Sequence, residues 1–546
     1  MFISIMILIV AIALPSINRN ISPNLYLRIS SLLLLYTGAL AFNAFYIQSI
    51  GSGIGIYSGL FQITLFTQLF DIVIVLTGSV ILIAWPLINH KFIDNNLELA
   101  ENKILSINNY RIKYSIIVLI STLGSLLLVS SSNLITLYLS LELQSFGVYI
   151  LASLYRHSEL AISAGLKYFL LGSLASCIIL LGCGLIYTFT GLTNLESIYS
   201  MISVIDNNNN ILLGFSLGLI LIFIGLLFKI AAAPLHNWAP DVYADSATII
   251  TTWLTIIPKI SILLILFEIQ THINLIDNIN IILELNPLNN IINNNYLWSK
   301  NLLLISSLLS LLIGTILGLA QSKLKRLLAY STISHVGFIL LALAINSEQS
   351  IEALIFYIIQ YTITNLNTFL IIILFGYIIK NSFRDLIQSI MVEDETGIEN
   401  DINYISELKG QFFLNPVLSI SLTICLFSMA GIPPLIGFFS KQFVLYSAIQ
   451  NGYYFMSIIA IIVSIISASY YLKIIKIIFT EEENTSEYSD KEIKIINNLN
   501  SNSEIEISST NSFIISTLTL SILFFVLKPS ILLNSTTILS LSLFNF

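Results

Sequence analysis

The sequence predicts an all-α polytopic membrane protein with about fourteen transmembrane helices. Hydrophobic residues make up 56% of its 546 residues and charged residues only 10%, whereas soluble proteins carry roughly 25% charged residues. The mean hydropathy of +0.90 over the whole length leaves no room for a large water-soluble domain. The alternating pattern of a transmembrane β-barrel is absent, so we expect helices to cross the bilayer.

Apolar runs near 20 residues long recur along the chain, and each is long enough to cross about 30 Å of hydrocarbon as a helix. Arg19 and Arg28 follow the first run, whereas the charges of a signal peptide precede its apolar segment. We therefore expect the first run to be a retained helix. The predicted spans are residues 2–17, 25–47, 66–88, 114–130, 133–154, 164–190, 211–233, 246–269, 301–320, 327–346, 351–379, 412–447, 452–478 and 511–534.

Basic residues concentrate in the loops that follow odd-numbered spans, and the loops after even-numbered spans contain almost none, apart from Lys300. Since Lys and Arg are enriched on the inner side of a membrane, the odd loops are expected inside and both termini outside. The basic residues of the odd loops are Arg19, Arg28, Lys91, Lys103, Arg111, Lys113, Arg156, Lys323, Lys325, Arg326, Lys380, Arg384, Lys409, Lys473, Lys476, Lys491 and Lys494.

Composition and motifs also exclude several functions. A net charge of −7 gives no indication of nucleic-acid binding, and the phosphate-binding glycine motifs are absent. Cys177, Cys183 and Cys425 lie in apolar runs without metal-ligand spacing. We therefore expect no cofactor or metal bound by this chain. Residues 480–510 are rich in Glu, Asn and Ser and predict a solvated inside loop or a docking surface for a neighbour.

Five ionisable residues fall in the middle of predicted spans: Glu142, Lys229, Lys259, His335 and Lys441. A charge at this depth costs roughly 2.5–3.5 kcal/mol on insertion scales, so pairing, water or function must compensate for it. A buried lysine can lose its proton, whereas an arginine effectively cannot. All six arginines lie in or beside loops, which favours a proton path over salt bridges that only fix helix packing. His335 fits a core histidine and a proton relay equally well.

Two spans contain helix-breaking sequences near a lysine. One has Pro234 after Lys229, and the other has Gly431, Pro433 and Pro434 before Lys441. Proline removes a backbone donor and clashes with the preceding turn. A broken helix at membrane depth exposes polar ends that can bind ions or water. An ordinary kink is the alternative, and the segment after Pro234 could instead be leaving the membrane.

The interrupted spans are the seventh and the twelfth, which are the fourth members of two five-helix units at residues 114–270 and 300–478. An offset of five spans reverses direction, so the units are expected to be inverted repeats, and paired interruptions in such repeats indicate an ion path. Residues 1–113 would form a three-helix N-terminal segment. Residues 479–546 would form the polar inside loop and a final helix.

Three motifs carry a resemblance to a known family. They are Lys229 with Pro-Leu-His-Asn-Trp-Ala-Pro-Asp-Val-Tyr at 234–243, Ile-Pro-Lys at 257–259, and Gly-Ile-Pro-Pro-Leu-Ile-Gly-Phe-Phe-Ser-Lys at 431–441. They resemble the antiporter-like membrane subunits of NADH:ubiquinone oxidoreductase (complex I). Lys441 and the lack of a Gly-Pro-Thr-Pro stretch favour its chain 2 branch over chains 4 and 5. Residues 244–248 also depart from the Glu-Gly-Ala-Pro-Thr form common in that branch.

The resemblance implies a core membrane-arm subunit that translocates protons, with NADH, FMN, iron–sulfur clusters and ubiquinone bound elsewhere in the assembled complex. Glu142 would modulate Lys229 as its ion-pair partner. Lys259 would be the central relay, Lys441 would connect to a neighbouring subunit or an exit, and His335 would assist.

Partners would be adjacent membrane-arm subunits and lipids. The location would be the mitochondrial inner membrane, since the Ile, Asn and Leu bias and the absent import sequence suit a mitochondrial gene of fungal length. Both termini would then face the intermembrane space. Two alternatives remain open: a subunit of a multi-subunit cation/proton antiporter, and an assembly scaffold whose charges only lock helices together.

Overall fold

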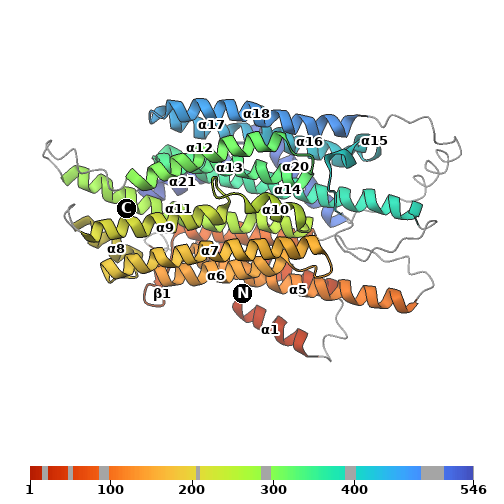
Figure 1. Ribbon diagram of the computed structural model, residues 1–546, viewed down its shortest axis with the longest axis horizontal. Helices are drawn as coiled ribbons and strands as arrows, with labels where there is room; N and C mark the ends of the chain where they lie inside the picture. The colour runs from red at the N-terminus through yellow and green to blue at the C-terminus, as the bar shows by residue number, and fades with distance from the viewer. Residues whose placement is uncertain are drawn as a thin grey trace.

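A computed structural model describes residues 1–14, 23–46, 53–84, 97–204, 210–283, 297–387, 401–480 and 509–544. Most helices run along the long axis of the molecule (Figure 1). They are α1 (Phe2–Ala13), α3 (Pro23–Ala44), α4 (Leu65–Ile83), α5 (Leu97–Val129), α6 (Leu134–Ala152), α7 (Glu159–Thr190), α8 (Leu195–Val204), α9 (Asn210–Ile230), α10 (Trp238–Asp245), α11 (Thr248–Leu283), α12 (Leu297–Leu319), α13 (Leu324–Ile345), α14 (Glu348–Ile387), α15 (Gln411–Leu414), α16 (Pro416–Ala430), α17 (Ile436–Gln450), α18 (Tyr454–Phe479), α20 (Ser509–Phe524) and α21 (Ser530–Phe544).

The predicted polytopic helical class is confirmed. Eleven of the described helices are long and apolar enough to cross a membrane, and they occupy eleven of the fourteen predicted spans. The first, seventh and twelfth predicted spans contain the shorter α1, the shorter α9, and the pair α16 and α17. The centre of the bundle is formed by α11 and α13, whose apolar windows are 100% and 94% buried.

Both predicted helix breaks are present, and each begins with the same kind of C-cap. After α9, Ala231 has a φ of 65° and the N–H of Ala232 donates to the carbonyl of Leu227. After α16, Gly431 has a φ of 88° and the N–H of Ile432 donates to the carbonyl of Phe427. A left-handed residue followed by this bond across five residues is a Schellman motif, which ends a helix and satisfies its last carbonyls.

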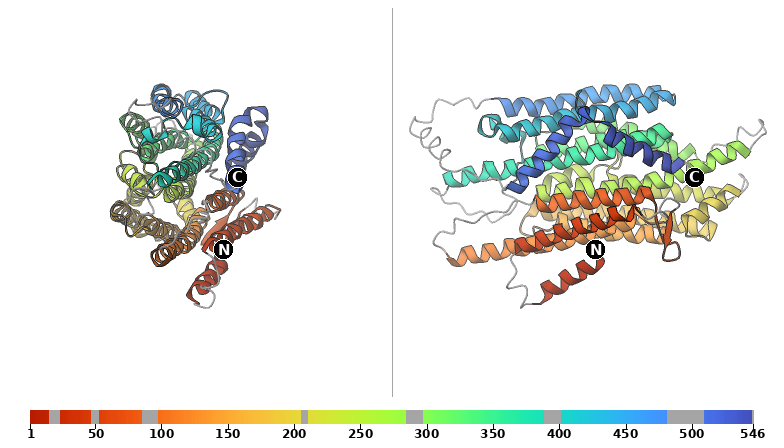
Figure 2. Two further views of the ribbon diagram at one scale, coloured as in Figure 1. Left: turned by 90° about the vertical axis from the view of Figure 1, so that its right-hand side faces the viewer. Right: turned by 180° about the vertical axis from the view of Figure 1, so that it is seen from behind.

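Some elements were not predicted from the sequence. No strand was expected between the second and third predicted spans, but Ile54–Ile56 form β1, which pairs antiparallel with β2 (Phe61–Ile63). The last predicted span is also more complex than expected. A 3-10 turn at Phe525–Leu527 separates α20 from α21, and the two helices slope in opposite directions (Figure 2). The predicted polar loop 480–510 lies almost entirely outside the described residues.

A buried network joins the start of α11 to α13 at one end of the bundle. Lys325 Nζ lies 2.5 Å from Asp401 Oδ2 and donates to the carbonyl of Ser246 at 2.9 Å. Thr248 donates to the same carboxylate through its backbone N–H at 2.9 Å and its hydroxyl at 2.6 Å. Each oxygen of the Asp401 carboxylate therefore accepts at least one hydrogen bond. Ser246 and Thr248, which belong to the segment 244–248 that departs from the family pattern, both bond this ion pair.

A second ion pair ties α10 to α13. Asp241 pairs with Arg326 and, at 3.4 Å, with Lys167 of α7. The side chains of Asp241 and Lys167 are 34% and 50% exposed, so solvent screens this contact. The segment between α9 and α11 is thus attached to the second half of the chain in two ways. Ser246 and Thr248 bond the buried Lys325–Asp401 pair, and Asp241 pairs with Arg326.

Breaking the buried Lys325–Asp401 pair should destabilise the protein far more than breaking the exposed Lys167–Asp241 pair. Asp401→Asn leaves the ammonium of Lys325 buried without a countercharge, and we expect a loss of about 3–5 kcal/mol in the free energy of unfolding. Lys167→Ala, the matched control, should cost under about 1 kcal/mol. Denaturant unfolding of the purified chain in lipid nanodiscs measures both values, and equal losses would contradict the assignment.

The α16–α17 break depends on a close approach that only glycine permits. A Cβ added at Gly437 would lie 1.9 Å from the carbonyl oxygen of Ser428, whereas one added at Gly184 would meet nothing within 4 Å. Gly437→Ala should therefore force the two helices apart at a cost of about 1–3 kcal/mol, and Gly184→Ala should be neutral or slightly stabilising. Thermal unfolding midpoints test this, and a Gly437→Ala variant as stable as the parent would refute it.

Candidate functional site

Lys229 lies in the last turn of α9, just before the first break, and faces Glu142 of α6. Its Nζ is 3.8 Å from Oε1 of Glu142, and the two side chains are only 7% and 15% exposed. Neither of these two atoms has a hydrogen-bond partner, and 3.8 Å is longer than a direct hydrogen bond. The two charges therefore attract each other without being locked together.

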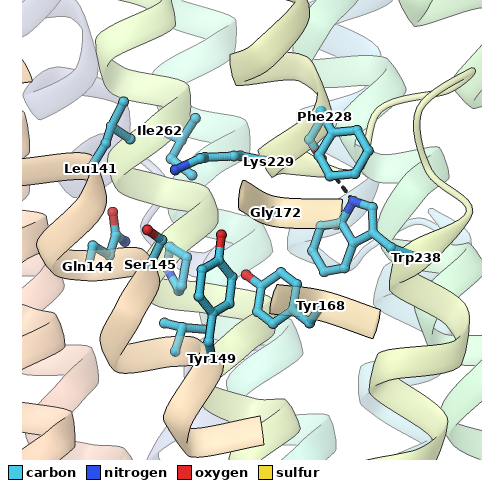
Figure 3. A pocket seen from close by; sticks show the side chains of 12 residues that line it. Leu141, Gln144, Ser145, Tyr149, Tyr168, Gly172, Phe228, Lys229, Trp238 and Ile262 are labelled. Carbon is cyan, nitrogen blue, oxygen red and sulfur yellow. Dashed lines mark hydrogen bonds between the residues drawn. The ribbon is translucent and has the colours of Figure 1, made fainter. Parts of the chain in front are cut away.

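A cavity of about 20 Å³ adjoins Lys229. Because one water needs roughly 10–15 Å³ and two to four polar partners, the space accommodates one. Figure 3 shows the amine of Lys229 above the side chains of Gln144 and Ser145, with the hydroxyl of Tyr149 pointing into the same region. The other lining residues are Leu141, Val148, Tyr168, Gly172, Phe228, Trp238, Pro258 and Ile262.

Trp238 of α10 satisfies the broken end of α9. Its indole Nε1 donates to the carbonyl of Phe228 at 2.9 Å (Figure 3), and its ring stacks on Tyr168 with centroids 4.6 Å apart. A helix end leaves carbonyl groups without partners, and this indole satisfies one of them. The lysine remains available to Glu142.

Gln144 links the cavity to α11. Its side-chain amide lies 2.8 Å from the hydroxyl of Ser261 and is 2% exposed. Ser261 follows Lys259 by two residues on the same helix. This bridge could not be predicted from the sequence. Serine hydroxyls in helices mostly bond their own backbone, so neither residue stands out in an apolar span.

Lys259 lies at the centre of the bundle on α11, with 2% exposure. Its amine donates to the hydroxyl of Thr332 on α13 at 2.9 Å and lies 5.4 Å from the ring centroid of Tyr243. Within the described part of the chain, no carboxylate forms an ion pair with it. An amine with neutral neighbours can hold or release a proton without breaking a salt bridge.

His335 follows Thr332 by one turn of α13 and contacts two other helices. Its Nδ1 lies 2.7 Å from the hydroxyl of Tyr357 on α14, and its Nε2 lies 3.3 Å from the hydroxyl of Tyr471 on α18. Phenol hydroxyls both donate and accept, so either neutral tautomer is satisfied. The geometry suits a core histidine, and it also forms a continuous line of exchangeable protons across three helices.

Lys441 of α17 caps the second break. Its amine donates to the carbonyls of Met429 at 2.8 Å and Ala430 at 2.9 Å, the last residues of α16. The same amine lies 5.7 Å from the ring centroid of Phe338 on α13. Unlike Lys229, this lysine is bonded to backbone oxygens that the break leaves free.

The helix α13 carries His335 and contacts both Lys259 and Lys441. Thr332, His335 and Phe338 recur every three residues along α13, where neighbours at this spacing share a face, and they contact Lys259, the two tyrosines and Lys441 respectively. On the side of the first break, Gln144 and Lys229 line the same cavity, and Gln144 bonds Ser261 of α11. Among the described residues, no group of His, Cys, Asp or Glu has the spacing to hold a metal ion.

Comparison with known proteins identifies the family of this chain. Residues 131–467 match the family model described as NADH:quinone oxidoreductase/Mrp antiporter, TM. The chain is 46% identical to NADH-ubiquinone oxidoreductase chain 2 of Rhizopus oryzae, with 99% of each chain covered. It is 35% identical to NADH-quinone oxidoreductase subunit N of Pelagibacter ubique, with 70% of this chain and 72% of that protein covered.

A structure of respiratory complex I from Thermus thermophilus contains a chain of the same fold. It superimposes with a TM-score of 0.63 at 23% identity and covers 94% of this chain and 97% of that chain. Because the family model spans more than half of the chain and the Rhizopus protein aligns over nearly all of it, the assignment rests on the whole bundle. This chain belongs to the NADH:quinone oxidoreductase/Mrp antiporter family of membrane subunits.

Proposed function

We propose that this chain is a core membrane-arm subunit of respiratory complex I, at the place of chain 2, and that it translocates protons through its buried lysines. The observation that carries the proposal is the set of three buried lysines around α11 and α13, the most buried helices. Lys229 faces Glu142, Lys259 bonds Thr332, and Lys441 bonds the end of α16. Oxidation of NADH by ubiquinone takes place elsewhere in the complex. FMN and iron–sulfur clusters likewise belong to other subunits.

Each buried group has a distinct role in the proposal. Glu142 stabilises the protonated form of Lys229, and a change in their separation alters the proton affinity of the amine. Lys259 receives the proton as the central relay, with Thr332 and His335 beside it. Lys441 passes the proton to a neighbouring subunit or to an exit, and Gln144 joins the first pair to the centre.

Magnitudes support a switch of this kind. Two unit charges about 4 Å apart interact by about 4 kcal/mol at an effective dielectric constant of about 20. Moving one charge through 100 mV costs about 2.3 kcal/mol. Separating Glu142 from Lys229 would therefore change the proton affinity by enough to work against a membrane potential. The loose 3.8 Å contact and its adjoining cavity favour such movement.

The breaks after α9 and α16 support inverted repeats at residues 114–270 and 300–478, because both end in the same Schellman geometry. The proposed location is the mitochondrial inner membrane, with the basic loops in the matrix and both termini on the intermembrane-space side. Neighbouring antiporter-like subunits and lipids would cover the apolar flanks.

Two other functions remain testable. The family model includes Mrp antiporters, so a sodium-dependent pH gradient formed without NADH would favour an antiporter subunit. An assembly scaffold would tolerate loss of the buried charges. If NADH oxidation still drives proton translocation normally in a Glu142→Gln, Lys229→Met double variant, the scaffold function would be favoured.

Lys229→Arg tests the proton step directly. Arginine can keep the attraction to Glu142 but effectively cannot release its proton, so we expect this subunit's share of the proton-to-electron ratio to be lost. NADH-driven proton uptake into inside-out vesicles containing the assembled variant complex provides the measurement. Lys167→Arg changes an exposed ion pair in the same way and is the matched control. Parental stoichiometry in Lys229→Arg would defeat the relay assignment.

A further inference from the structure

The terminal helix is also interrupted, and its break lies beside the one between α16 and α17. Phe525, in the turn between α20 and α21, packs its ring 5.6 Å from that of Phe439 in α17 and 5.5 Å from that of Phe356 in α14. Phe439 precedes Lys441 by two residues. The terminal break therefore lies at the depth of the buried proton-carrying groups, about halfway along the bundle (Figure 2).

Lys528 follows this break and is exposed on the surface of the bundle. Its neighbours on that surface are large and apolar: Phe524 is 50% exposed, Leu527 77% and Ile531 63%. Such a surface faces hydrocarbon or another protein. The four-carbon stem of lysine is far shorter than half of the about 30 Å hydrocarbon core, so the amine cannot reach water by snorkelling from this depth.

Within the described part of the chain, no acidic residue pairs with Lys528. Residues 507–546 contain no other charged residue, and the four ion pairs of the described residues lie elsewhere. A lysine at bilayer depth costs roughly 2.5–3.5 kcal/mol on insertion scales. An acidic group from outside the chain would remove this cost.

The surface beside Lys528 has the form of a helix-binding strip. On α21, Ile531, Asn534, Ile538 and Leu541 recur at the helical spacing of one face, and all four are exposed, with Ile538 at 65% and Leu541 at 44%. Leu527 precedes the helix, in the turn. Apolar anchors at this spacing receive a packed partner helix. The exposed face of α21 fits a partner helix, and the basic Lys528 just before it favours a partner with an acidic side chain.

We propose that Lys528 and this strip of α21 receive a transmembrane helix of a neighbouring membrane-arm subunit, and that this helix presents an Asp or Glu carboxylate to Lys528. The contact would lie at the depth of Lys441, on the far side of Phe439 and Phe525. It requires assembly into a membrane arm but not proton translocation by this chain, so the two proposals fail independently.

Site-specific cross-linking within the assembled complex identifies the occupant. A photo-crosslinking amino acid placed at Leu527 or at Ile531 leaves Lys528 intact. We expect both positions to form adducts with one membrane subunit, within about two helical turns of an Asp or Glu in a predicted span. Adducts with lipid alone, or with a helix that has no carboxylate near the adduct, would overturn the proposal.

Charge exchange tests the pairing itself. Lys528→Glu should lower the amount of this chain in assembled complex by at least about tenfold, because it places two carboxylates together in a dry interface. Lys528→Arg should stay within about twofold of the parent. The matched control is Lys473→Glu, whose lysine is also exposed but lies in the last two turns of α18, near its predicted inside end, and it should assemble normally.

The cross-linked carboxylate changed to Lys should restore assembly of Lys528→Glu to at least half of the parental level. Normal assembly of Lys528→Glu by itself, or no recovery with the reversed pair, would refute the carboxylate contact. None of these readouts measures protons, so their failure would leave the relay assignment untouched.

Discussion

The requirement that backbone groups be satisfied at membrane depth determines how the two broken helices differ. Both breaks free carbonyl oxygens that need donors. Trp238 supplies its indole to Phe228 at the first break, whereas Lys441 supplies its amine to Met429 and Ala430 at the second. Lys229 faces Glu142 instead of a backbone carbonyl. Two lysines in corresponding places of the chain consequently have different neighbours, and only one of them has a carboxylate beside it.

The helix α13 connects the centre of the membrane to one end of the bundle. Its first turn carries Lys325, buried against Asp401 and the start of α11, and its middle carries Thr332 and His335. Because α11 carries Lys259, both partners of the Lys259–Thr332 bond lie on helices joined by the same buried ion pair, about two turns away along α13 and three turns away along α11. This attachment helps to keep the central amine and hydroxyl at bonding distance.

The sequence predicted those parts of the site that are costly in a membrane. Mid-span lysines stand out because apolar surroundings penalise charge, and Pro433 and Gly431 stand out because they break helices. Gln144–Ser261 and Lys259–Thr332 could not be predicted, since they join residues 117 and 73 positions apart and use groups that are common in helices. Asp401 resembles any loop acid, and its bonds to Thr248 span 153 positions. The break before α21 was missed because Pro529 lies near the end of an apolar run.

Two buried ion pairs of the chain differ in how tightly their charges are held. Lys325 and Asp401 lie 2.5 Å apart and share further bonds with Ser246 and Thr248, so moving either charge would break several bonds at once. Lys229 and Glu142 are also buried, but they lie 3.8 Å apart, and the two facing atoms have no hydrogen bond and a cavity beside them. A pair evolved only to fix packing would be expected to resemble the first. The unsatisfied geometry of the second leaves room for water and for a change of partner, which a proton path requires.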